Sequence, residues 1–146
     1  MHSPDPLHKS PIWTILLVED EESVRQITRH VLESAGYLVL EASGPEQAID
    51  LFSRFEGSIH LLLTDMIMPT MNGAELAARL KELRPNLIAI LMSGYAATTT
   101  LFPTHLYTGA WYIQKPFTVQ SLLSRVAEAL STPQAQLPAA ENRLPV

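Results

Sequence analysis

The chain has 146 residues, a net charge of -5 at pH 7 and no cysteine. Hydrophobic residues make up 47% of it and charged residues 17%, a balance typical of one globular domain rather than a disordered chain. The missing cysteine excludes disulfides and thiolate metal sites, and the negative charge argues against direct binding to nucleic acid. The longest strongly apolar run, residues 87–92, is too short to cross a bilayer, and residues 1–11 lack a secretory apolar core. We therefore expect a cytoplasmic protein that does not insert into a membrane.

The two ends differ in composition from the middle of the chain. Residues 1–11 contain three prolines and show no periodicity, and residues 131–146 mix proline, alanine and glutamine. We expect the first segment to be a disordered or linker tail and the second to be a tail or linker stub. Residues 12–130 then form the single folded domain.

Within this domain, short apolar runs alternate with segments of helical spacing. The runs are IWTILLVED at 12–20, YLVLEAS at 37–43, IHLLLTD at 59–65, LIAILMSG at 87–94 and AWYIQKP at 110–116. Because the runs are apolar on both faces and are separated by helices, they predict a parallel sheet that is covered on both sides. Right-handed crossovers then give a doubly wound, flavodoxin-like α/β fold with five strands in the order 2-1-3-4-5.

Four of the connecting segments carry an apolar stripe at helical spacing. The stripes are Val24, Ile27, Val31 and Ala35; Ala48, Leu51, Phe52 and Phe55; Leu76, Leu80 and Leu83; and Leu122, Val126 and Leu130. Capping signals precede the last three stripes: Ser43 with Glu46, Asn72 with Glu75, and Thr118. Residues 95–110 contain three consecutive threonines and Pro103, which oppose a regular helix, so we expect a short or distorted fourth helix there.

Polar residues stand at the carboxyl ends of four runs, which in this fold is the edge where ligands bind. They are Glu19 with Asp20, Asp65, Ser93 and Lys115. Three carboxylates at one edge repel each other unless a cation joins them, and oxygen ligands without His or Cys favour a magnesium-like ion. With a lysine and a hydroxyl beside them, these acids predict a site for a phosphoryl group, at which an aspartate can act as nucleophile.

Each of these residues also has a structural explanation when it is taken singly. Acids after a strand commonly begin a helix, and Asp65 is also suited to cap a turn before Pro69. Ser93 and Lys115 are typical of a turn and of a surface charge. Their joint occurrence at the ends of adjacent strands is what favours a functional site.

At these positions the chain resembles the receiver domain of bacterial two-component response regulators. The resemblance lies in ILLVEDEE at 15–22, LLLTDMIMPTMNG at 61–73, LMSGYA at 91–96 and YIQKPF at 112–117, in the order and spacing of that family. The wording LMSGYA and QKPFT is also similar to receivers at the carboxyl end of hybrid histidine kinases. The resemblance implies a flavodoxin-like fold and a role as phosphoacceptor in a phosphorelay.

The resemblance also implies a role for each matching residue. Asp65 matches the aspartate that accepts the phosphoryl group. The ligands of Mg²⁺, or of Mn²⁺ in its place, are Asp20, Asp65, the main-chain carbonyl of Ile67 and, through water, Glu19. Ser93, Lys115 and Tyr112 match the catalytic and switch residues that respond to the phosphoryl group, and Pro116 matches a proline that often follows a cis peptide bond.

The implied partner is a histidine kinase or a histidine phosphotransfer protein, which supplies the phosphoryl group from a phosphohistidine. Phosphorylation then switches a protein-interaction surface, and a homodimer formed on phosphorylation is a further partner that the resemblance allows. The chain is thus expected to be a signalling phosphoacceptor and not an enzyme that acts on external substrates. No output domain is expected after residue 130, so a stand-alone receiver and the receiver of a hybrid kinase remain alternatives.

Other functions fit the sequence less well. A phosphohydrolase with an aspartate nucleophile needs a second acid two residues later, where this chain has Ile67. A flavodoxin-type electron carrier needs a phosphate-binding loop after the first strand, where the acids at 19–22 would repel a phosphate. A phosphorylation-independent interaction module with the same fold stays open. The five histidines lack zinc-site spacing. Arg25 and Arg29, near the site, are interpreted as solvated side chains, with contact to a kinase partner as the alternative.

Overall fold

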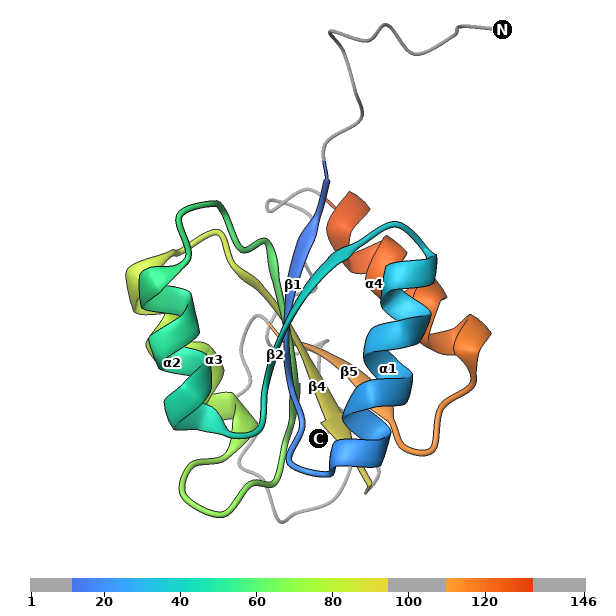
Figure 1. The fold of residues 1–146 in the computed structure, drawn as a ribbon, viewed down its shortest axis with the longest axis horizontal. Coiled ribbons are helices and arrows are strands. Elements are labelled where there is room, and N and C mark those ends of the chain that lie inside the picture. The colour runs from blue at the N-terminus through green and yellow to red at the C-terminus, as the bar shows by residue number, and fades with distance from the viewer. Residues whose placement is uncertain (1–11, 95–109, 133–146) are drawn as a thin grey trace, which may run out of the picture.

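The computed structural model describes residues 12–94 and 110–132 of the chain. The elements are β1 (Thr14–Val18), α1 (Glu22–Ser34), β2 (Leu38–Ala42), α2 (Pro45–Arg54), β3 (Leu61–Asp65), α3 (Gly73–Leu83), β4 (Ile88–Ser93), β5 (Ala110–Gln114) and α4 (Val119–Ser131). The five strands are parallel in the order β2-β1-β3-β4-β5, which confirms the predicted topology (Figure 1). The segment expected to form a distorted fourth helix, and almost all of the two tails, lie outside the described residues. Within the described ranges, no helix combines the length and the apolar content that a membrane span needs.

Helices cover the sheet on both faces. Figure 1 shows α1 and α4 on one face and α2 and α3 on the other. Alternate residues of the central strands supply two separate cores: Ile15 and Leu17 of β1 point to the α1–α4 side, and Leu16 and Val18 to the α2–α3 side. All four side chains are fully buried. Since each contributes about 1.5–3 kcal/mol by burial, the apolar residues of β1 fix where the end of this strand lies.

The strand register places the functional ends side by side. Val18 of β1 pairs with Thr64 of β3, so the next residues, Glu19 and Asp65, come level at the edge of the sheet. The main-chain N–H of Glu19 extends the β1–β2 pairing with a 3.1 Å hydrogen bond to the Ala42 carbonyl. The carboxyl edge is therefore a continuous rim that carries the predicted site residues.

Two of the three expected helix caps are confirmed. The Asn72 side chain accepts a hydrogen bond from the Glu75 main-chain N–H, and the Glu75 side chain accepts one from the Asn72 main-chain N–H. Thr118 forms the corresponding box with Ser121. The box expected from Ser43 and Glu46 is wrong. The N-cap of α2 is Gly44, because Pro45 occupies the first helical position, where its missing N–H is not needed.

The residues at positions 43 and 47 form a local contact in place of that box. The main-chain N–H and the hydroxyl of Ser43 both donate to Gln47 Oε1, at 2.7 and 3.1 Å. The Ser43 hydroxyl is thus occupied one residue before the helix cap, and the start of α2 is determined by Gly44 and Pro45.

Two of the predicted apolar stripes also need correction. In α1 the buried residues are Thr28 and Leu32, whereas Ile27 is 66% exposed and Ala35 is an exposed C-cap. The buried face follows i, i+4 spacing through a threonine, which a search for apolar residues alone overlooks. In α3, Leu83 is 61% exposed because it is the last residue of the helix and lies beyond the sheet-facing turns.

Candidate functional site

A pocket of about 240 Å³ opens at the carboxyl edge of the sheet, between the ends of β1, β3, β4 and β5. Its lining consists of Glu19, Asp20, Glu21, Asp65, Ile67, Met92, Ser93, Gly94 and Lys115. The fold therefore brings together six of the eight residues that the sequence predicts for the site. The other two, Tyr112 and Pro116, lie in the neighbouring hollow described below.

Lys115 is the centre of the polar contacts in this pocket. Its Nζ donates hydrogen bonds to Glu19 Oε1 at 2.8 Å and to Asp65 Oδ1 at 2.7 Å. Glu19 Oε2 accepts a further hydrogen bond from the Glu21 main-chain N–H at 3.1 Å. Glu19 and Asp65 are only 1% and 5% exposed, whereas Asp20 is exposed at the mouth of the pocket. One lysine thus balances two buried acids, and a third acid stands beside them.

Burial and the neighbouring charges shift the pKa values in the pocket. Burial raises the pKa of Asp65 to about 7, the adjacent Glu19 carboxylate acts in the same direction, and Lys115 opposes the shift. Burial would also raise the pKa of Glu19, but its contacts with Asp65, Lys115 and the Glu21 N–H outweigh this effect and lower it. Lys115 has a raised pKa, since its two carboxylate partners outweigh the loss of hydration. Glu19 and Lys115 therefore form the charged pair, and Asp65 holds its proton most readily.

The acids of the pocket fit a metal ion. Ligand oxygens of Glu19, Asp20 and Asp65 lie within 4.8 Å of one another, and within the described ranges this is the only cluster of three such residues. Asp65 Oδ2 is buried without a hydrogen-bond partner, so a ligand atom is free in the pocket. Carboxylate oxygens without His or Cys are the donors that hard divalent cations prefer.

The loop after β3 holds Asp65 in place from behind. The Gly73 N–H donates to the Met66 carbonyl at 2.7 Å, and a Cβ at Gly73 would lie 2.2 Å from the Asp65 carbonyl oxygen. Glycine is needed here for close approach of two backbone segments. The Ile67 side chain is 55% exposed at the mouth of the pocket, with no acid at this position.

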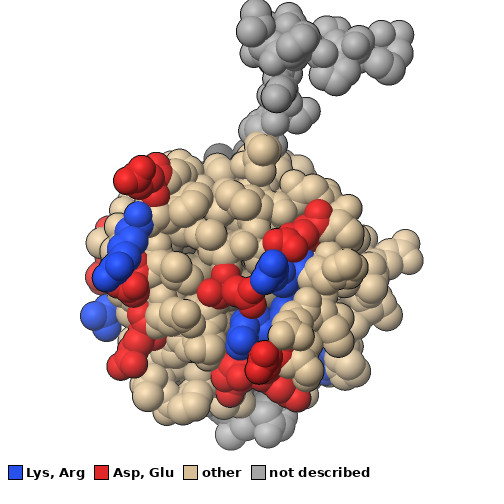
Figure 2. All heavy atoms as spheres, in the orientation of Figure 1, with Lys and Arg blue, Asp and Glu red and all other residues tan. Residues whose placement is uncertain are grey.

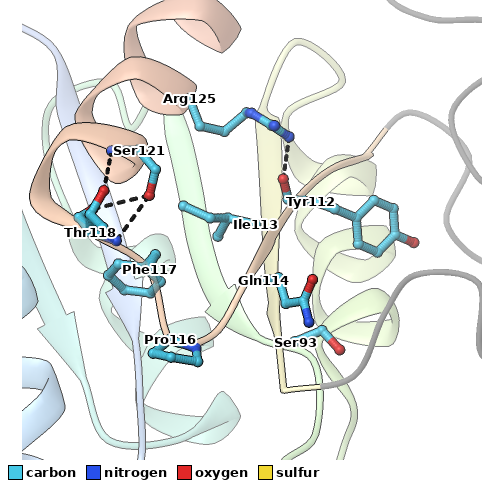
Figure 3. A pocket seen from close by; sticks show the side chains of 9 residues that line it. All are labelled: Ser93, Tyr112, Ile113, Gln114, Pro116, Phe117, Thr118, Ser121 and Arg125. Atoms are coloured by element: carbon cyan, nitrogen blue, oxygen red, sulfur yellow. Dashed lines mark hydrogen bonds between the residues drawn. The ribbon is translucent and has the colours of Figure 1, made fainter.

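A second hollow of about 460 Å³ adjoins the pocket and shares Ser93 with it (Figure 3). Tyr112 and Pro116 line this hollow, and the Lys115–Pro116 peptide bond is cis. In Figure 3 the Tyr112 ring extends to the opposite side of β5 from Ile113, which belongs to the core against α4. Arg125 of α4 donates a hydrogen bond to the Tyr112 main-chain carbonyl.

The sequence analysis did not anticipate how Arg25 and Arg29 of α1 are used. Both side chains bind Glu41 of β2, and Arg25 also donates a 2.9 Å hydrogen bond to the main-chain carbonyl of Glu19. Arg25 is only 16% exposed, so its interpretation as a solvated side chain is wrong. A sequence signal for this contact does exist: Arg25 stands six residues after Glu19, the acid at the end of the first strand, and Glu41 lies on the neighbouring strand.

Comparison with known proteins places this pocket in a family. The family model described as the response regulator receiver domain matches residues 15–127. The response regulator receiver protein CpdR of Brucella abortus is 34% identical over 116 residues, which cover 80% of this chain and 95% of CpdR. The sensor kinase CckA of the same organism is 34% identical over 119 residues, but the chain spans only 12% of that kinase.

Solved structures give the same result for the fold. The receiver domain from the hybrid histidine kinase CckA has a TM-score of 0.69 at 32% identity and covers 81% of this chain and 99% of that domain. The response regulator TrrA of Thermotoga maritima, solved in complex with Mg²⁺–BeF, has a TM-score of 0.69 at 26% identity and covers 82% and 100%. Sequence match, strand order and acidic pocket agree, and the chain belongs to the response regulator receiver domain family.

Proposed function

We propose that this chain is the phosphoacceptor of a two-component phosphorelay and that Asp65 accepts the phosphoryl group. The observation that carries the proposal is the position of the Asp65 carboxylate. It is held at 2.7 Å by Lys115, lies within reach of Glu19 and Asp20, and keeps Oδ2 free of hydrogen bonds. A nucleophile, a positive donor and a set of cation ligands are the parts that phosphoryl transfer needs.

In the proposed step, the ionised Asp65 carboxylate attacks the phosphorus of a phosphohistidine on a partner. The P–O bond to Asp65 forms as the P–N bond breaks, and the imidazole leaves with the electron pair of that bond. Asp20, Asp65, the Ile67 carbonyl and, through water, Glu19 would hold Mg²⁺, which would supply positive charge for the phosphoryl oxygens. Lys115 Nζ would supply a second positive charge, because it already donates a hydrogen bond to Asp65 Oδ1.

The same residues provide a switch. The added phosphoryl group brings negative charge to Lys115 and to the Ser93 hydroxyl, which lines the same pocket. We infer that Ser93 then moves toward the phosphoryl oxygens and that Tyr112, which shares the adjoining hollow with it, follows. The phosphorylated state thereby alters the surface around β5 and α4, where a protein partner or a second copy of the chain would bind.

The proposed donors are a histidine kinase and a histidine phosphotransfer protein. The similarity to the receiver of a sensor kinase and to the receiver protein CpdR supports this class of partner. Ile67 supports a phosphoacceptor over a phosphohydrolase, because no acid stands two residues after Asp65 to activate water for turnover.

Intact mass spectrometry tests the proposal. The protein is incubated with acetyl phosphate and Mg²⁺, and we expect one added phosphoryl group, which Asp65→Asn and an excess of chelator both abolish. Glu75→Gln, on an exposed helix start outside the pocket, serves as a control and should be phosphorylated like the parent. A phosphoryl group on Asp65→Asn, or one that appears without metal, contradicts the assignment. An unmodified parent protein favours the phosphorylation-independent interaction module.

A further inference from the structure

Arg25 connects the pocket to β2 through two hydrogen bonds. From the second turn of α1 its side chain turns back toward the start of the helix. There Nη1 donates to the Glu19 carbonyl oxygen at 2.9 Å and Nε donates to Glu41 Oε1 at 3.0 Å. Figure 2 shows basic and acidic side chains interleaved over α1 and β2 on this face of the molecule. Arg25 is the more buried of the two arginines that bind Glu41, at 16% exposure against 45% for Arg29.

Glu19 is held at every polar group it has. Its N–H donates to the Ala42 carbonyl of β2, and its side chain binds Lys115 and the Glu21 N–H. Its carbonyl accepts a hydrogen bond from the Arg25 guanidinium of α1. This carbonyl shares one rigid peptide plane with the N–H of Asp20. The orientation of that plane, together with the φ and χ1 angles of Asp20, sets the direction in which the Asp20 carboxylate leaves the main chain.

We propose that Arg25 is a positioning residue for the metal site. Because it bonds both the Glu19 carbonyl and the Glu41 carboxylate, it fixes the Glu19 peptide group and so orients Asp20 toward the cation. The inference rests on the proposed function, since it assigns Asp20 as a metal ligand. Asp20 has particular need of such support, because it is the exposed member of the acid cluster while Glu19 and Asp65 are buried. Residues that orient metal ligands typically cost about 10- to 100-fold in metal affinity when they are removed.

Two simpler roles of Arg25 make different predictions. If Arg25 were only a latch, meaning a contact that fastens α1 to β2, its removal would lower the free energy of unfolding and leave the metal affinity unchanged. The same would hold for Arg29, which also binds Glu41. As a nearby positive charge, it would be replaced fully by lysine. A lysine has a single amino group and cannot span the Glu19 carbonyl and Glu41 together in the fixed geometry of a guanidinium.

The test compares Arg25→Gln, Arg25→Lys and the matched control Arg29→Gln with the parent protein. Arg29→Gln removes the same charge and a contact to the same Glu41, but leaves the Glu19 carbonyl bonded. Mg²⁺ affinity is measured by isothermal titration calorimetry and Mn²⁺ affinity by electron paramagnetic resonance of the free ion. Thermal unfolding of each variant in chelator shows that the compared proteins are folded.

We expect Arg25→Gln and Arg25→Lys to bind Mg²⁺ about tenfold or more weakly than the parent, and Arg29→Gln to bind it like the parent. If Arg25→Gln does not fold, the Mg²⁺ affinity of Arg25→Lys relative to the parent decides between the proposal and a simple charge effect. Equal affinities for Arg25→Gln and Arg29→Gln overturn the proposal in favour of a latch, and full affinity in Arg25→Lys overturns it in favour of simple charge. A parent protein that binds neither metal overturns the proposed function together with this inference.

Discussion

Gly73 lies directly behind Asp65, the phosphoacceptor we propose, so replacing it with alanine tests how tightly the fold holds Asp65. A Cβ at Gly73 would lie 2.2 Å from the Asp65 carbonyl oxygen and 3.1 Å from Met66 Cα. Real Cβ contacts under 3.0 Å are essentially never observed. The distance from the new Cβ to the Asp65 carbonyl oxygen must therefore grow from 2.2 to at least 3.0 Å, so the two backbone segments must move apart by about 0.8 Å. The hydrogen bond from the Gly73 N–H to the Met66 carbonyl, at 2.7 Å, opposes that movement.

The cost follows from this geometry. Overpacking a filled site typically costs about 1–3 kcal/mol, and the obstacle here is main chain that cannot rotate aside, so we expect Gly73→Ala to lose about 2–3 kcal/mol of unfolding free energy. The displaced carbonyl belongs to Asp65 itself. Because misplacing a reacting group by 1 Å can slow a reaction about 100-fold, we also expect phosphorylation to slow by about tenfold or more.

Urea unfolding followed by circular dichroism measures the first effect, and a time course of intact mass with acetyl phosphate measures the second. The matched control is Gly44→Ala, which also stands at a helix start but has no atom within 4 Å of the new Cβ. Weaker capping by alanine should cost this control no more than about 1 kcal/mol and leave phosphorylation unchanged. Equal stabilities and equal rates for the two variants would refute the close-approach argument.

Three further predictions concern stability. The Asp65 carboxyl keeps its proton to about pH 7 in the folded protein but ionises near 3.8 in the unfolded chain. Stability without metal should therefore fall as the pH rises between these values, and Asp65→Asn should remove this fall in urea titrations with chelator at pH 5 and pH 8. His60 Nδ1 accepts the Thr14 N–H at 3.0 Å, and burial together with the charge of Arg84 lowers its pKa below 6.5. The contribution of His60 to the free energy of unfolding should be complete above pH 6.5 and lost as the pH falls through its lowered pKa. Thermal melts of His60→Asn at acid pH should not show this decline. Asn72→Ala should lose about 1 kcal/mol by removing the cap of α3; a thermal denaturation midpoint unchanged from the parent would contradict the capping assignment.

The sheet could be predicted from the sequence because its strands lie in short, mostly apolar runs. Each run between Thr14 and Gln114 became a strand, and the order of the strands follows from right-handed crossovers. The helix faces were harder to predict, since α1 buries Thr28 while it leaves Ile27 exposed. Hydrophobicity alone cannot predict a buried threonine or an exposed isoleucine on the same helix.

The members of the site could be predicted, but their contacts could not. Strand ends in a parallel sheet meet at one edge, which is why Glu19, Asp65 and Lys115 were found from their positions alone. The link from Arg25 to Glu41 depends on the path of α1 over β2 and on side-chain length, neither of which has a periodic signal in the sequence. The burial of Glu19 at 1% likewise depends on how the whole rim closes over it.

The reach of Lys115 has a consequence for how the protein is made. This residue follows the edge strand β5, yet it bonds Asp65, which ends β3, and Glu19, which follows β1, at separations of 50 and 96 residues along the chain. Contacts between such distant residues require most of the chain to be ordered first. During synthesis, the amino-terminal strands therefore lack the lysine that completes the pocket. On the function we propose, competence to accept a phosphoryl group would therefore arise only when β5, the last strand, docks.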